Sequence, residues 1–170
     1  MNKKALIIGF LYTSLVIVFK LYIWLGGHTF SDFYFKYAHI LSVLAIIPFL
    51  MLAIKLVRDK DNQGIISGKE AMRIALTVVA VSAIVLSVYN YIEFKFSIQD
   101  YAEYYRSDKY MAFLVKDPKA KQLGYEKIID FQISQLSPFK AATGKLFPFL
   151  LITLSASFIC AVFMKKGPKH

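Results

Sequence analysis

The stretch ALIIGFLYTSLVIVFKLYIWL, residues 5–25, decides the fold class. It holds a single charged residue, Lys20. A transmembrane α-helix needs about 20 consecutive apolar residues, because each residue rises about 1.5 Å across a hydrocarbon core about 30 Å thick. The stretch therefore predicts a membrane-spanning helix and places the chain in the all-α integral membrane class.

The composition of the whole chain agrees with this prediction. Of its 170 residues 57% are hydrophobic, and the mean hydropathy is +0.50, whereas a soluble domain is about 45–50% apolar. The net charge of +10 comes from basic residues that flank apolar runs, so we interpret them as topological signals and contacts for anionic lipid, not for nucleic acid. The single cysteine, Cys160, excludes a disulfide framework within one chain.

Further apolar runs predict three more spans, at residues 37–57, 71–92 and 146–164. Pro48 removes a backbone donor and is expected to kink the second span, and Pro148 is expected in the first turn of the fourth, where proline is tolerated. Ser67 and Glu70 fit a capping box that starts the third span, after a turn at residues 61–64. The chain is predicted to be one membrane domain, residues 1–170, with four transmembrane helices.

Basic residues predict the orientation of these spans. The two termini, the 58–70 loop and the adjoining helix ends together hold ten basic and three acidic residues. Short basic segments stay in the cytoplasm, so we expect both termini inside.

The long segment between the third and fourth spans, about residues 96–144, is predicted to be helical and to lie outside the cytoplasm. A first helix is expected to start at Ser97. A second, at about 124–136, carries its apolar residues on one face. This stripe has three candidate partners: the membrane surface, the ends of the spans or another protein. The candidate partner or lipid interface residues are Tyr101, Tyr105, Ile129 and Ile133.

Polar residues near the outer ends of three spans form a candidate ligand-binding cluster: Lys20, His39, Asn90 and Glu93. Lys20 follows 15 residues of its span, about 22 Å of helix. A lysine in hydrocarbon costs about 3 kcal/mol unless it reaches water or a partner. One interpretation is a polar pocket in which Lys20 pairs with Glu93. The other, which we favour, is that the lysine extends to the interface.

No catalytic constellation is found in the sequence. The three histidines lack metal-ligand spacing, and phosphate-binding loops and nucleophile motifs are absent. We therefore expect no enzyme activity, no cofactor and no metal.

The pattern resembles a known family. Its features are a basic N-terminus before the first span, IISGKEAMRIAL at residues 65–76, YNYIEFKF at residues 89–96, and FMKK at residues 163–166. They resemble the small four-span inner-membrane proteins of the domain of unknown function 4199, common in Bacteroidota. The resemblance implies four spans and a bacterial envelope setting, and it brings no activity or site residues.

Two functions lead among those that remain open from the sequence, and a membrane-embedded enzyme acting on lipid-linked sugars or acyl chains is a third, for which no acid, base or nucleophile constellation is visible. The leading hypothesis is a non-enzymatic subunit or accessory factor of the bacterial inner membrane that binds another envelope protein. The alternative is a transporter-like protein for a small solute or lipid that uses the polar cluster. Because four spans are few for a transporter, the alternative requires a homodimer.

Overall fold

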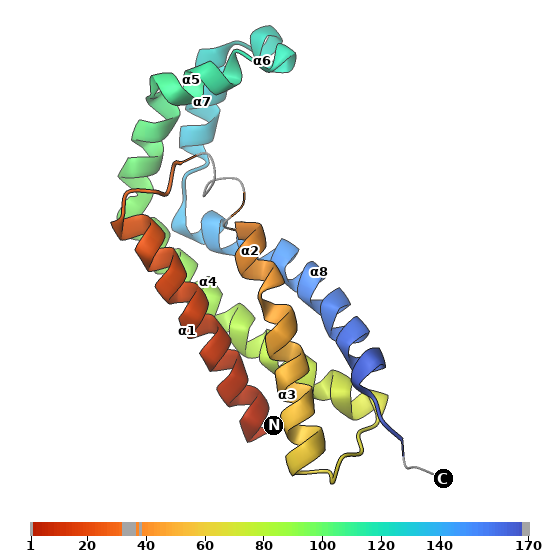
Figure 1. Cartoon of the computed structure of the whole chain (residues 1–170). Coiled ribbons are helices and arrows are strands. Elements are labelled where there is room, and N and C mark those ends of the chain that lie inside the picture. The colour runs from red at the N-terminus through yellow and green to blue at the C-terminus, as the bar shows by residue number, and fades with distance from the viewer. Residues whose placement is uncertain (1, 32–36, 38, 168–170) are drawn as a thin grey trace. The chain divides into compact units, whose positions relative to one another are not determined.

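The computed structural model describes residues 2–31, 37 and 39–167 (Figure 1). The described part holds eight helices: α1 (Lys3–Leu25), α2 (His39–Leu44), α3 (Ile46–Lys60), α4 (Gly68–Arg106), α5 (Asp108–Leu114), α6 (Pro118–Leu123), α7 (Tyr125–Ser134) and α8 (Pro138–Met164). The chain divides into two compact units. The first unit comprises Met1–Leu86 and Leu146–His170, and the second unit comprises Ser87–Lys145.

Four helical segments are long and apolar enough to cross a membrane: Lys3–Leu25, Ile40–Lys60, Gly68–Arg106 and Pro138–Met164. The predicted all-α class with four spans is confirmed, and the chain is a membrane protein. Two of the helices are longer than predicted. Because α8 starts at Pro138, Pro148 lies inside this helix and not in its first turn, which corrects the prediction.

The first unit is built around one apolar core between α1, α3, α4 and α8. Its largest fully buried side chains include Tyr12, Ile46, Leu50 and Ile54. In Figure 1, α1, α3 and α8 run beside one another and the first part of α4 crosses behind them. Each helix buries only part of its surface here, and the apolar side chains on the remaining surface are suited to lipid.

Small residues let the helices of the first unit approach closely. A Cβ atom added at Gly9 on α1 would lie 3.1 Å from Cβ of Val81 on α4. The buried serine and threonine hydroxyl groups in this core donate to carbonyl oxygens of their own helices, at 2.9 Å from Thr13 to Gly9 and 2.7 Å from Ser157 to Thr153. These polar groups are therefore satisfied without a partner helix, and the small side chains serve close packing.

The second span is interrupted between α2 and α3, at Ala45. Pro48 cannot donate to the carbonyl of Leu44, and its ring clashes with that carbonyl in a regular helix. The helix therefore ends at Leu44 and restarts at Ile46, so that Pro48 falls in the first turn of α3. The expected distortion at Pro48 is confirmed.

The end of the first unit that carries the N-terminus is tied together by three polar contacts. The Lys4 ammonium pairs with the Asp61 carboxylate. Ile66 and Lys166 exchange two backbone hydrogen bonds of 2.9 Å. Ser67 Oγ accepts from the Glu70 amide at 3.2 Å, as a capping box requires.

The carboxylate of the predicted capping box takes a different partner. Oε1 of Glu70 accepts from Nδ2 of Asn62 at 2.7 Å. The Glu70 side chain thus stabilises the turn that precedes α4, in which Gln63 and Gly64 both have positive φ.

The second unit has a small core of its own, made by the last turns of α4 with α5, α6 and α7. Its buried members are Tyr110, Leu114, Ala120 and Ile129. Asp117 caps α6 by accepting from the Lys119 amide at 2.9 Å. The predicted helix at about 124–136 is present as α7, Tyr125–Ser134.

The predicted helix start at Ser97 is wrong, because α4 continues through it to Arg106. The Ser97 hydroxyl donates to the carbonyl oxygen of Glu93 at 2.9 Å, one turn back in the same helix. A serine used in this way does not need to cap a new helix.

Candidate functional site

The four residues of the predicted polar cluster are divided between the two units. Lys20 lies half-buried on α1 in the first unit. His39 is the first residue of α2, and its side chain lies outside the described part of the structure. Asn90 and Glu93 lie one turn apart on α4 in the second unit. Because these residues belong to different units, their convergence at one site stays a prediction.

Glu93 has aromatic neighbours within its own unit. It interacts electrostatically with the hydroxyl groups of Tyr89 and Tyr101 on the same helix. The Tyr101 ring in turn packs against Phe94, with ring centroids 4.8 Å apart. Lys20, Asn90 and Glu93 all have interaction partners. Glu93 and Tyr101, predicted to serve two different sites, therefore share one environment on α4.

The apolar stripe of α7 packs inside the second unit. Ile129 is buried, and Ile133 and Tyr105 are half-buried against the same core. Tyr105 also meets Tyr110 edge to face, with centroids 4.9 Å apart. The stripe predicted as a partner or lipid surface thus has a partner within the chain, the helices α5 and α6 and the end of α4.

Other apolar side chains of the second unit are left exposed, among them Phe96 at 69% and Phe139 at 68%, and the four that lie from α5 to α7 are its candidate contact residues. Phe113 is 58% exposed, Val115 59%, Leu123 64% and Phe131 61%. We refer to these four residues as the exposed apolar set. The period of the apolar stripe does not indicate these four residues, because they lie off it. A large aromatic off the stripe of α7, Phe131, was the available indication.

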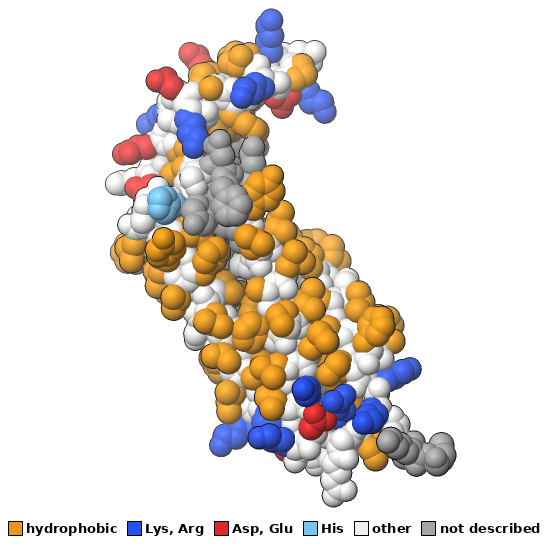
Figure 2. Space-filling model, in the orientation of Figure 1, with side chains coloured by type: hydrophobic (Ala, Val, Ile, Leu, Met, Phe, Trp, Pro, Cys, Tyr) orange, Lys and Arg blue, Asp and Glu red, His pale blue; other side chains and the backbone are white. Residues whose placement is uncertain are grey.

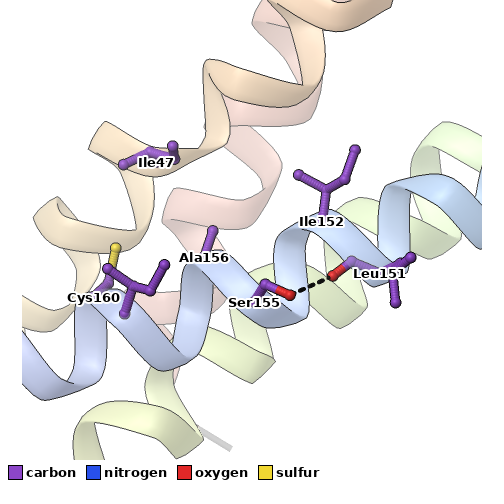
Figure 3. A pocket seen from close by; sticks show the side chains of 7 residues that line it. Ile47, Leu151, Ile152, Ser155, Ala156 and Cys160 are labelled. Carbon is purple, nitrogen blue, oxygen red and sulfur yellow. Dashed lines mark hydrogen bonds between the residues drawn. The ribbon is translucent and has the colours of Figure 1, made fainter.

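The first unit contains an open groove between α3 and α8, with a volume of about 440 Å³. Ile47 of α3 lines one side, and α8 residues between Leu151 and Cys160 line the other. Figure 3 shows Ile47 on its own helix opposite Ala156 and Cys160. The hydroxyl of Ser155 is the polar side-chain group in this lining, and it donates to the carbonyl oxygen of Leu151 at 3.0 Å. The groove thus presents an apolar surface.

Positive charge gathers at one end of the first unit. Figure 2 shows Lys and Arg side chains at the end that carries the N-terminus, while hydrophobic side chains cover the body. The exposed basic residues there include Lys55, Lys69, Arg73, Lys165 and Lys166. This arrangement matches a span bundle whose charged rim meets lipid headgroups.

Comparison with protein families identifies the family of the chain. Residues 4–166 match the family model described as Protein of unknown function (DUF4199). The chain belongs to this family. The match covers both units of this DUF4199 protein and confirms the resemblance found in the sequence. No curated protein and no solved structure matches the chain.

Membership in DUF4199 assigns no chemistry, so the site must be argued from the chain itself. Within the described residues of this DUF4199 protein, no group of three or more His, Cys, Asp or Glu side chains is arranged to hold a metal ion. Two surfaces remain: the exposed apolar set of the second unit, and in the first unit the apolar groove with the basic residues at the end of that unit, which we refer to as the basic rim.

Proposed function

We propose that the protein is a non-enzymatic component of the bacterial inner membrane, and that its second unit binds another envelope protein. The observation that carries the proposal is the exposed apolar set, on a unit that already has its own core. A segment that only linked two spans would not need a core.

The core of the second unit supports the proposal because it holds the helices that carry the exposed apolar set in fixed positions. Ile129 and Tyr110 are buried, so α5 and α7 are held by packing within the unit. Phe113 and Phe131, on the same two helices, are each more than half exposed. Exposed aromatic side chains on a pre-formed surface are the usual anchors of protein interfaces.

The charge of the second unit is nearly balanced. Residues 87–145 hold nine basic and seven acidic residues. Such a surface has little attraction for a polyanion. It suits a protein contact in which apolar side chains supply the affinity and charged side chains determine how the two partners align.

The proposed orientation places both termini in the cytoplasm and the second unit outside it. The basic rim supports this choice, since basic residues next to spans are retained in the cytoplasm. The Ile66–Lys166 pairing joins the 61–67 turn to the C-terminal tail, which places them at one end of the first unit.

The test is purification of the full-length protein from its own membrane in mild detergent, followed by native mass spectrometry. We expect a second protein at fixed stoichiometry with the wild type. The double variant Phe113→Ser/Phe131→Ser should lose it.

The matched control is Phe147→Ser/Phe158→Ser, which removes two exposed phenylalanines from α8 in the first unit. The control should keep the partner. A partner retained equally by both double variants, or absent from the wild type, would overturn the proposed function.

A further inference from the structure

We propose that the groove between α3 and α8, together with its basic rim, binds one anionic phospholipid: an acyl chain lies in the groove and the phosphate meets Lys55 and Lys166. This inference concerns the first unit alone and goes beyond the proposed function, so the two can fail separately.

The groove selects an apolar occupant. Its α8 side is one helical face that repeats every three to four residues from Leu151 to Cys160. Because the Ser155 hydroxyl is already bonded within its helix, the groove offers little to a polar solute. Its volume of about 440 Å³ lies within the range of about 300–1,000 Å³ typical of small-molecule sites.

The groove is also open to the bilayer. Both helices belong to segments that cross the membrane, and the lining residues Ile47, Leu151 and Ile159 are 37%, 61% and 53% exposed. The hydrocarbon chains of lipids are the material that surrounds such a surface in a membrane. An acyl chain therefore matches the groove in polarity and in place.

Positive charge lies beyond one end of the groove. Lys165 follows Cys160 by five residues, about 8 Å of helix, and Lys55 follows Ile47 by eight residues, about 12 Å. Asp59 on α3 interacts electrostatically with both Lys55 and Lys166. The end of α3 and the tail after α8 therefore lie near each other, with Lys55 and Lys166 both close to Asp59.

The acidic residue in this cluster does not cancel its charge. Arg58 donates to both carboxylate oxygens of Asp59, at 2.7 Å and 3.3 Å. With that pair neutral, the net charge of the cluster comes from Lys55 and Lys166. The two backbone hydrogen bonds to Ile66 fix the position of Lys166. The Lys166 side chain therefore extends from a backbone whose position is fixed.

The charge is what makes the site specific for anionic lipid. Both α3 and α8 end here with their carbonyl groups, which repel a phosphate. Backbone amides of these helices cannot bind it, and recognition depends on lysine side chains. A zwitterionic lipid would fill the groove equally well but would gain little from the lysines.

The experiment is native mass spectrometry of the purified full chain with phosphatidylglycerol and phosphatidylcholine at equal concentration. We expect the wild type to retain one phosphatidylglycerol with a preference of about thirtyfold, from two lysines near the surface. Lys55→Gln/Lys166→Gln should bring the preference close to one. The charge-matched control Lys69→Gln/Arg73→Gln, on α4 at the same end of the unit, should keep it.

A second pair of variants tests the groove. Ser155→Phe fills it from an exposed position, whereas Leu154→Phe places the same side chain on α8 outside the lining, although it adds less volume. Ser155→Phe should lose the retained lipid, and Leu154→Phe should retain it.

Folding of every variant is checked by circular dichroism and gel filtration. Equal retention of the two lipids by the wild type would overturn the charged part of the proposal. Retention of phosphatidylglycerol by Ser155→Phe at the wild-type level would show that the acyl chain does not bind in the groove.

Discussion

The hydroxyl of Tyr12 on α1 donates a hydrogen bond of 2.8 Å to the carbonyl oxygen of Ser42 on α2. Ser42 lies in the last turn of α2, where carbonyl groups lose their intrahelical partners. Inside a membrane no water is available to donate a hydrogen bond to this carbonyl. The Tyr12 hydroxyl on the neighbouring helix therefore stabilises the interruption that Pro48 imposes on the second span.

Removing this hydroxyl should destabilise the first unit. Tyr12→Phe keeps the ring and its contact with Phe49, at 5.5 Å between centroids, but leaves the Ser42 carbonyl unsatisfied. We expect a loss of about 1 kcal/mol in the free energy of unfolding, measured in detergent by denaturant titration. Tyr22→Phe is the control, since Tyr22 is 63% exposed. Equal effects of the two variants would contradict this role.

Two glycines in helices should respond in opposite ways to alanine. Gly9→Ala places a methyl group 3.1 Å from Val81 Cβ and 3.3 Å from the Val78 carbonyl oxygen. We expect a loss of about 1–3 kcal/mol from overpacking between α1 and α4. Gly144→Ala meets nothing within 4 Å. It should gain about 0.5–1 kcal/mol from helix propensity. Thermal unfolding of both variants in the same detergent measures the difference, and stabilisation by Gly9→Ala would show that the helices are not in close contact.

The core and the surface of α7 should separate by mutation. Ile129→Ala opens a cavity in the second unit and should cost about 2–5 kcal/mol. Phe131→Ala, two residues away on an exposed position, should change stability by less than about 0.5 kcal/mol. Hydrogen exchange of the amides of α5 and α7 reports the opening of this unit. Faster exchange in the Phe131 variant than in the Ile129 variant would reverse the assignment of the two faces.

Buried Tyr110 should make the second unit sensitive to alkaline pH. Burial, and then the neighbouring Tyr104, raise the pKa of the Tyr110 hydroxyl above its usual value of 10.0. A raised pKa in the folded state means that the neutral form stabilises folding at pH below 10, and that this contribution is lost as the pH rises above it. Helicity followed from pH 8 to 12 should fall earlier in the wild type than in Tyr110→Phe. Identical curves would show that Tyr110 does not contribute.

The spans were predictable because each is an apolar run of about 20 residues with at most one charged residue, which is the pattern of a membrane helix. The extension of α4 was not. Residues 93–106 mix charged and aromatic side chains. A prediction based on hydropathy therefore ends the helix at the end of the apolar run, whereas α4 continues to Arg106. Ser97 fits a cap from the sequence alone, but α4 continues through it and its hydroxyl donates to the Glu93 carbonyl.

The site was less predictable than the fold. The stripe through Ile129 was identified correctly as the apolar face of a helix, but a periodic pattern cannot tell whether its partner lies in the same chain. The groove depends on how α3 and α8 pack, which no spacing within either helix encodes. Charge counting found the basic rim but not the position of Lys55 and Lys166 around Asp59.

The proposed orientation predicts which residues an impermeant thiol reagent reaches. Cys160 is buried, and Cys160→Ser provides a cysteine-free background. Single cysteines then replace Lys60 at the end of α3 and Lys119 on α6, both exposed. In spheroplasts a charged maleimide should label Lys119→Cys at once and Lys60→Cys only after lysis, because an even number of spans returns the chain to the side where it began. Labelling of Lys60→Cys before lysis, with Lys119→Cys protected, would place the termini outside and show that the basic rim does not set the topology.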